Sequence, residues 1–426
     1  MVSIYTIMSH HPTAHHPPPA VHTTNTSSSH APKAAAAAGH RVKTGGLNLP
    51  VTQAISLPAS QKHETLIIPA SSTASFGSYY TIDIREKGVL LHNLTLQFNY
   101  SAVSGTSLVG AFSPSWFHWT RIEIYQGGSV IDTLYNNSQF ILQQMLEFDE
   151  DRLNLAAGSY ANLAQRTLLS SQSTTNTFYC PLKTYFDQTK MALLTDSHAI
   201  QLRVYTSNLT DCFTVASGTL TTCAINSVNA ICSVTRLDSV TVQQKVEAIK
   251  HSPHHYIMHD TRYGNFVIPS GNTTSTIVLA SIVGNVSALM FTVRGATTGV
   301  NAWNYTQLQS FHLLDAASTS LVGGQPLPSF LCTNVLNAKW MKSSYYQENS
   351  WGLVDNKANV YLWSFSADPV SALEHGQALG SRAFKGNEQL VLNFVSALGS
   401  QVIVDVYALC ENILEQGEFS IKKISM

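Results

Sequence analysis

The residues whose spacing comes closest to a chemical site are four histidines near the middle of the chain, at His251, His254, His255 and His259. Neutral imidazole is a common metal ligand, and this spacing could bring two of the rings together. Imidazoles four residues apart converge where a helix aligns them, and this segment shows no helical pattern. We therefore expect histidines stacked in a crevice between two domains, and we assign no metal-binding residue.

The other motifs that could support catalysis are incomplete. His63-Glu64 lacks the second histidine of the HExxH zinc motif, and residues 105–110 miss the G-x-S-x-G spacing of a hydrolase nucleophile by one residue. No GxxxxGK[ST] phosphate loop occurs, and no GxGxxG motif opens a helix after a strand. The acidic residues 149–151 follow a predicted surface helix, where solvated carboxylates are expected. The sequence thus predicts no catalytic residue, no cofactor-binding residue and no cofactor.

The elements that would have to position any such residues are mostly β-strands. Apolar and polar residues alternate over short stretches that are separated by glycine, proline and asparagine. In the first half this pattern begins at Leu66 and predicts strands at 81–87, 94–100, 121–125, 129–134, 178–186, 200–205 and 231–246. Gly127-Gly128 predicts a tight turn, and the Thr/Ser/Asn-rich insertion at 211–229 is expected to be an exposed loop.

One helix is predicted within the first half, over residues 139–148. Its apolar residues form a single stripe at Ile141, Leu142, Met145 and Leu146. Asn137 or Ser138 is placed to cap its start, because a side-chain oxygen there can accept from a free backbone N–H group. The helix therefore interrupts an otherwise all-β half.

The second half shows the same alternating strand pattern and ends in a distinctive segment, residues 359–410, which we call the closing block. Strands are predicted at 264–269, 276–279, 288–294, 311–315 and 330–333, and a loop at 334–357. The closing block has strands at 360–365, 389–395 and 401–409, with a long loop between the first two. Asp368-Pro369 ends the first of these, because proline lacks the N–H group that a sheet needs. A Phe-His pair followed by Gly-Gly occurs in both halves, at 117–128 and 311–324, which favours two copies of one architecture.

Composition points to a protein that associates with others. Charged residues make up 12% of the 426 residues, against about 25% in an ordinary soluble domain. A surface so poor in charge cannot rely on repulsion to stay monomeric, so we expect neighbouring subunits to cover much of it. The formal net charge of −1 gives no general attraction to nucleic acid. No apolar stretch approaches the ~20 residues that a membrane-spanning helix needs.

The cysteines and the N-x-S/T triplets give no evidence of secretion. Six cysteines show neither a CxxC pair nor metal-ligand spacing, so free thiols in a reducing compartment are expected. A disulfide among Cys212, Cys223 and Cys232 is the alternative. Several N-x-S/T triplets occur, as chance predicts in a chain rich in these residues, and no signal peptide accompanies them.

Residues 1–48 differ in composition from the rest of the chain. They are rich in histidine, proline and alanine, contain no Asp or Glu, and carry three basic residues, Lys33, Arg41 and Lys43. Such a segment cannot bury enough apolar surface to fold, so we predict a disordered arm. Its mildly basic character would suit contact with an anionic surface or nucleic acid.

The closing block resembles the end of viral double jelly-roll major capsid proteins. In this lineage, which includes nucleocytoplasmic large DNA viruses, virophages, polintons and polinton-like viruses, an "SF…P…PSG…NFSR" segment precedes a "V.VYA…N.L" strand. Residues 363–369 read WSFSADP, and residues 404–414 read VDVYALCENIL. The PSG element is reduced to His-Gly at 375–376, and NFSR to Gly-Ser-Arg at 380–382. Residues 117–148 are similar to the first jelly roll, with its helix between strands F and G.

The resemblance covers residues 66–426 and implies an all-β fold: two tandem eight-stranded antiparallel jelly rolls with a few short helices and long loops. The expected domains are the arm at 1–48, a first jelly roll at 49–248 and a second at 249–426. The loop at 371–387 is then a candidate contact between subunits. Its residues 375–376 and 380–382 are expected to shape the loop and form hydrogen bonds between subunits rather than to make a site.

The function implied is structural and not enzymatic. Three chains would form a homotrimeric, pseudo-hexagonal capsomer, and capsomers would tile an icosahedral virion shell around a DNA genome after synthesis in the host cell. Neighbouring capsomers, penton proteins and minor or cement proteins are the expected partners, and the arm could contact genome DNA or an inner membrane. Two alternatives stay open: a spike- or fibre-type β-sandwich that binds a receptor or glycan, and a jelly-roll metalloenzyme.

Overall fold

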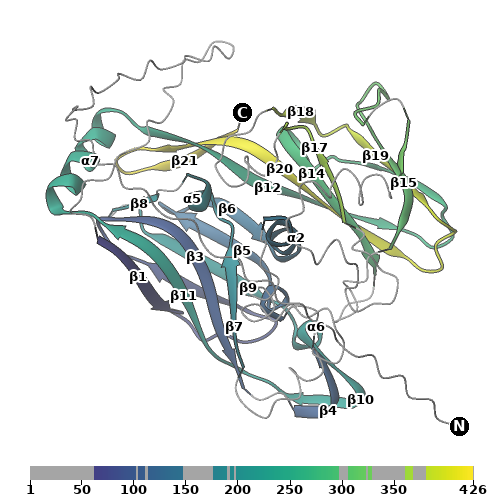
Figure 1. The fold of residues 1–426 in the computed structure, drawn as a ribbon, viewed down its shortest axis with the longest axis horizontal. Helices are drawn as coiled ribbons and strands as arrows, with labels where there is room; N and C mark the ends of the chain where they lie inside the picture. Colours follow the sequence, from purple (N-terminus) through teal and green to yellow (C-terminus); the bar gives the residue numbers. More distant parts are fainter. Residues whose placement is uncertain are drawn as a thin grey trace, which may run out of the picture. The chain divides into compact units, whose positions relative to one another are not determined.

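The computed structural model describes residues 62–101, 104–110, 114–146, 176–189, 192–195, 198–296, 306–322, 325–328, 360–367 and 380–425. The predicted arm, the acidic residues 149–151, the strand predicted at 330–333 and the loop at 334–357 lie outside these residues. In the part described, antiparallel strands form two β-sandwiches, which we call the first and second sandwich (Figure 1). No helix in that part is long and apolar enough to cross a membrane.

The first sandwich has two main sheets. Sheet I has the order β1 (Lys62–Pro69), β11 (Ile225–Arg236), β3 (Val89–Tyr100), β7 (Asn176–Leu182), and β8 (Ala192–Leu194) also pairs with β3. Sheet II has the order β2 (Tyr79–Ile84), β9 (Ile200–Thr206), β5 (Trp119–Gln126), β6 (Ser129–Tyr135). A separate ribbon pairs β4 (Ser104–Gly110) with β10 (Phe213–Thr222).

The second sandwich repeats this plan. Sheet III has the order β12 (His254–Ile268), β20 (Val402–Gln416), β14 (Val283–Gly295), β17 (Val360–Ser364). Two further strands extend it, β18 (Arg382–Lys385) beside β14 and β21 (Ile421–Ser425) beside β20. Sheet IV has the order β13 (Thr274–Val278), β19 (Gln389–Phe394), β15 (Leu308–Leu314), β16 (Leu327–Pro328).

The two sandwiches have the same topology. If the eight principal strands of each are numbered along the chain, sheets I and III both read 1-8-3-6, and sheets II and IV both read 2-7-4-5. Four antiparallel strands in each of two facing sheets, connected in this order, make a jelly roll. The predicted fold class of two tandem antiparallel jelly rolls is therefore confirmed, and the three strands predicted in the closing block are β17, β19 and β20.

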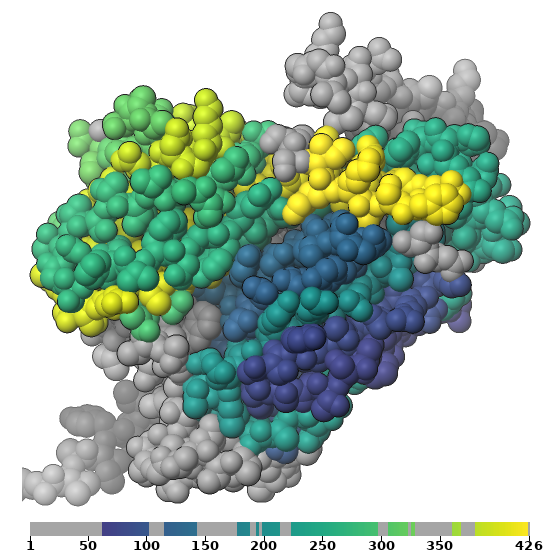
Figure 2. All heavy atoms as spheres, turned by 180° about the vertical axis from the view of Figure 1, so that it is seen from behind, coloured from purple at the N-terminus to yellow at the C-terminus, as the bar shows by residue number. Residues whose placement is uncertain are grey.

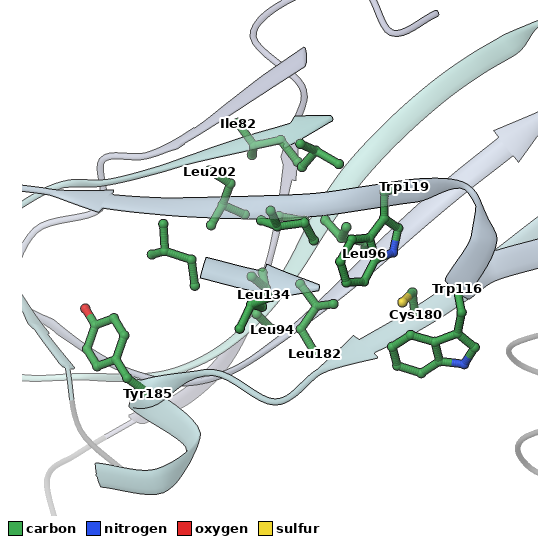
Figure 3. Packing of buried hydrophobic residues seen from close by; sticks show 14 of the residues in the cluster. Ile82, Leu94, Leu96, Trp116, Trp119, Leu134, Cys180, Leu182, Tyr185 and Leu202 are labelled. Atoms are coloured by element: carbon green, nitrogen blue, oxygen red, sulfur yellow. The ribbon is translucent and has the colours of Figure 1, made fainter. Parts of the chain in front are cut away.

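Side chains that alternate inward from both sheets fill each sandwich. In the first, Ile82 and Leu202 of sheet II face Leu94, Leu96 and Leu182 of sheet I (Figure 3). A second buried cluster fills the other sandwich, including Phe291, Phe311, Tyr361, Leu392 and Val404. The period-2 pattern of the sequence places these residues, because successive side chains of a strand point to opposite faces.

Helices occupy the connections between strands. They are α1 (Pro114–Phe117), α2 (Asn136–Leu146), α5 (Tyr185–Thr189), α6 (Leu209–Cys212) and α7 (Ser239–His251). The helix predicted at 139–148 is α2, but its predicted caps are wrong, because Asn137 and Ser138 lie inside its first turn. The turn at Gly127-Gly128 is confirmed: both residues have positive φ, 58° and 82°, which glycine adopts without steric cost.

Three strand or loop predictions of the first half are wrong at their ends. The strand predicted at 231–246 ends at Arg236, and its valines continue in α7, where the Asp238 carboxylate caps the helix by accepting from the Thr241 backbone N–H (2.9 Å). The strand predicted at 178–186 ends at Leu182, because Asp187 accepts from Thr184 and starts α5. Much of the loop predicted at 211–229 is strand, as β10 and the start of β11.

Candidate functional site: the joint between the sandwiches and the exposed sheet faces

The four clustered histidines do not converge. His251 ends α7 beside Glu247, whereas His254, His255 and His259 lie along β12. His255 is 3.1 Å from Glu415, and the buried His259 is 3.9 Å from Glu411. Burial lowers the pKa of His259 to about 4, which keeps its imidazole neutral. In the described ranges, no group of three or more His, Cys, Asp or Glu side chains is arranged to hold a metal ion.

The remaining motif residues make ordinary structural contacts. His63 lies 3.0 Å from the Thr235 hydroxyl, and Glu64 accepts from Arg236 (3.0 Å), so each binds a neighbour on β11. Residues 105–110 belong to β4, and residues 149–151 and 375–376 lie outside the described residues. Five cysteines are free thiols, as expected, at Cys180, Cys212, Cys223, Cys232 and Cys410.

The described part of the loop at 371–387 contacts its own chain. Gly380 has φ +127°, and a Cβ there would lie 3.1 Å from the Phe365 carbonyl oxygen. Ser381 donates to Glu411 (2.7 Å), and Arg382 lies 3.7 Å from Asp315. Residues 382–385 form β18, so this end of the predicted loop is instead a strand of sheet III. Its predicted role between subunits stays a prediction.

A further candidate site is the joint between the sandwiches. The outer face of sheet III, which points away from the core of the second sandwich, packs on the first sandwich. The ring of Tyr263 on β12 lies 4.7 Å from that of Tyr135 on β6 and 5.2 Å from that of Tyr407 on β20. Met290 and Leu362 extend the same row and are buried in the cluster of the first sandwich. This apolar row holds the two jelly rolls together.

Hydrogen bonds to buried partners fix the joint at two further places. The Asn137 side chain at the start of α2 donates to the Thr292 hydroxyl on β14 (3.4 Å). Near the other end, the Gln416 amide of β20 donates to the Leu193 carbonyl oxygen of β8 (3.2 Å). Because buried polar groups are costly to leave without partners, these bonds favour one fixed arrangement of the sandwiches.

Buried charges lie where β21 meets both sandwiches. Asp260 on β12 accepts from Lys423 of β21 (2.6 Å) and from Asn412 of β20 (2.5 Å). Asp132 on β6 is buried nearby and accepts from the backbone N–H groups of Thr133 and Tyr185. Burial, and secondarily the negative charge of Asp260, raise the pKa of Asp132 to about 7. Lys423 therefore compensates carboxylates contributed by both sandwiches.

No family model matches the sequence, and no curated protein matches it. Solved structures do match the fold. The PBCV-1 virus capsid chain superposes with a TM-score of 0.64 at 16% identity, over 87% of this chain and 98% of that one. The Faustovirus major capsid protein gives 0.62 at 8% identity, over 87% and 93%. The mavirus major capsid protein gives 0.51 at 12% identity, over 89% and 92%. These likenesses show that this chain has a double jelly-roll fold.

The double jelly roll also presents an organised outer face on sheet II. Arg121 stacks over the Tyr205 ring (4.1 Å) and Arg203 over the Tyr125 ring (4.9 Å), and both tyrosine hydroxyls donate to Glu123 (3.0 and 2.9 Å). In Figure 2 this face is toward the viewer, with the purple, teal and blue bands of β2, β9, β5 and β6 in that order. Its charged and aromatic side chains hold one another in place.

Sequence reasoning missed the residues that make the joint of this double jelly roll. Asp132 lies in the first third of the chain and Lys423 near its C-terminus, so their spacing gives no motif. The available signal was local: Asp132 is a lone acid within the apolar stretch of β6, SVIDTLY. A charge at such a position indicates a buried partner from elsewhere in the fold.

Proposed function

We propose that this chain is the major capsid protein of an icosahedral DNA virus, located in the capsid shell of the virion. The observation that carries the proposal is the match of both jelly rolls, over 87–89% of the chain, to the PBCV-1 capsid and two major capsid proteins. Such a protein acts by assembly, as a structural protein and not as an enzyme. The low content of charged residues, 12%, suits a surface that is largely used in subunit contacts.

The proposed assembly unit is a homotrimeric, pseudo-hexagonal capsomer. Two sandwiches of identical topology, fixed to each other by the joint, would give six similar modules when three chains form a closed ring. Neighbouring capsomers would then be the main partners in the shell, together with penton proteins and minor or cement proteins. The loops between strands would supply contacts that differ from one edge of the ring to another.

The domain limits belong to the same proposal: an arm at 1–48, a first jelly roll at 49–248 and a second at 249–426. Sheets I and II lie within 62–236 and sheets III and IV within 254–425, which supports a boundary in or beside α7. The arm, acid-free and mildly basic, would act on the inner side of the shell. Genome DNA or an inner membrane is its proposed contact.

The test is the assembly state of the purified full-length chain. Mass photometry should give the mass of three chains, and negative-stain electron microscopy should show particles with a hexagonal outline. At high concentration, sheets or shells of these particles are expected. A chain that stays monomeric at every concentration and forms no ordered array would refute the capsid function.

The sheet II face favours a second candidate function, a receptor- or glycan-binding β-sandwich of the spike or fibre type. Tyr79 is 54% exposed on this face, and the Tyr205 ring lies 5.9 Å from it. Exposed aromatic rings with hydrogen-bonding neighbours such as Gln201 and Asp83 can bind sugars. Glycan-array binding that Tyr79→Ala abolishes, in a chain that never assembles, would favour this function over the first.

A further inference from the structure

Sheets I and III are the same sheet of the jelly roll, but among the described residues the chain covers the outer face of sheet III far more than that of sheet I. The outer face of sheet III is buried in the joint, along the row Tyr263, Tyr407, Met290 and Leu362. The outer face of sheet I is open in the described residues, apart from one end that α7 covers through Val242 and Ile249. In the part of the chain that the structure describes, the first sandwich therefore has an open face at the place where the second sandwich packs on its neighbour.

The central part of the outer face of sheet I lacks charge. Over 65–69, 93–99, 177–181 and 227–233, the side chains that alternate outward are Thr, Ile, Pro, Ser, Asn, Gln and Tyr, and none is acidic or basic. A surface that faces water normally carries charges of both signs over about a quarter to a third of its residues. Depletion of charge is the compositional mark of the centre of a protein interface.

The face also has the layout of an interface. Its central row crosses all four strands through Ile67, Ile231, Thr95 and Pro181, and Ile67 is 64% exposed. The next row is polar but already satisfied: Asn229 donates to Gln97 (2.8 Å), and Gln97 donates to the Tyr179 hydroxyl (3.0 Å). An apolar row beside amides that bind one another can be desolvated at low cost.

We propose that the outer face of sheet I is an intersubunit contact of the capsomer, covered by the second sandwich of a neighbouring copy of this chain. The inference rests on the proposed capsid function. Within one chain, the second sandwich uses its sheet III face against the first. A ring of chains closes when a similar contact also forms between one chain and the next. In that contact the outer face of sheet I would take the place that the outer face of sheet III has within one chain, because the two sheets have the same strand order.

The charged outer face of sheet II supplies a matched control. Thr81 lies on it, at the edge strand β2 opposite Arg203, and is half-buried like Thr95. Thr95→Lys places a charge at the centre of the proposed contact, and Thr81→Lys places the same charge on the other sheet of the same sandwich. Ile67→Lys adds a second variant at an exposed edge position, where a lysine can reach water in the monomer.

The experiment measures oligomer mass against concentration for the full-length chain and the three variants, with thermal unfolding to show that each is folded. We expect Thr95→Lys and Ile67→Lys to raise the concentration needed for the oligomer by about 100-fold or more, because a buried charge without a partner is strongly unfavourable. Thr81→Lys should assemble like the wild type. Folded Thr95→Lys and Ile67→Lys chains that assemble as well as the control would overturn the inference.

Two further outcomes are distinguishable. A wild-type chain that is monomeric at all concentrations refutes the proposed function itself, whereas an intact oligomer in every variant refutes only the assignment of sheet I.

Hydroxyl-radical footprinting of the wild-type oligomer decides the matter if the variants do not fold. Tyr179 on sheet I should be protected while Tyr79 on sheet II stays reactive, and equal reactivity would overturn the assignment.

Discussion

Asp132 is a carboxylic acid in a place that water hardly reaches. It is 2% exposed, and burial together with the charge of Asp260 raises its pKa to about 7. In an unfolded chain an aspartate titrates near pH 4. Between about pH 4 and about pH 7 the folded state therefore binds more protons than the unfolded state at this group. The contribution of Asp132 to the free energy of unfolding falls as pH rises through that window.

The first prediction follows for Asp132→Asn, which removes the ionisable group and keeps an acceptor for the backbone N–H groups. At pH 8 the variant should be more stable than the wild type by about 1–3 kcal/mol, and at pH 4 the two should be equal. Thermal unfolding at both pH values measures this, with the partly exposed Asp83→Asn as control. A variant destabilised equally at both pH values would contradict the assignment.

His118 is the opposite case, an imidazole held neutral in the core of the first sandwich. It stacks on Phe98 with ring centroids 4.3 Å apart, and its nitrogens lie 2.8 and 3.4 Å from the Tyr100 and Tyr80 hydroxyls. Burial lowers its pKa to about 3, below the value near 6.5 of an unfolded chain. Its contribution to stability is complete above pH 6.5 and is lost as pH falls toward 3.

The second prediction concerns His118→Phe. At pH 8 the variant should lose about 1–3 kcal/mol, because two buried tyrosine hydroxyls lose their partner. At pH 5 the difference in free energy of unfolding between the variant and the wild type should be smaller. The reason is that unfolding of the wild type exposes an imidazole that then binds a proton, which favours its unfolded state. Urea unfolding at the two pH values checks this. A gap that widens on acidification would show that His118 is charged in the folded state.

At the scale of elements, the hairpin between β5 and β6 depends on backbone conformation rather than contacts. Gly128 has φ +82°, and a Cβ added there would meet no atom within 4 Å. Gly128→Ala should therefore cost about 1 kcal/mol of the free energy of unfolding, all of it conformational. Gly399→Ala is the matched control, because that site is equally open and has no positive φ. Equal values for the two variants in urea unfolding would contradict the argument.

Periodicity predicted most strands because each sandwich has one core face and one outer face. Periodicity gave the wrong element where a helix cap or a distant partner strand decides the local structure. Val240, Val242 and Val246 look like a strand, but the Asp238 cap and the packing of Val242 on Leu90 make α7. The pairing of β10 with β4 depends on a segment about a hundred residues away, which a polar composition does not reveal.

For the whole molecule, the sequence predicted two tandem jelly rolls but not the surface that joins them. Tyr407 alternates with core residues of β20 and gives the strand apolar content on both faces, which was visible in the sequence. Its partner Tyr135 lies on β6, and no local pattern connects the two. The same limit applies to Lys423 and Asp132, because their proximity exists only after both sandwiches have formed.

The last prediction tests whether the second sandwich folds without the first. Produced alone, residues 252–426 would expose the joint row that includes Tyr407, Met290 and Leu362. Burying such side chains contributes about 1.5–3 kcal/mol each, a large part of the 5–15 kcal/mol that stabilises a typical domain. We expect this fragment to aggregate alone and to copurify as a soluble complex when coexpressed with residues 54–251. Light scattering and copurification measure both outcomes, and a soluble, cooperatively melting 252–426 monomer would show that the joint is dispensable.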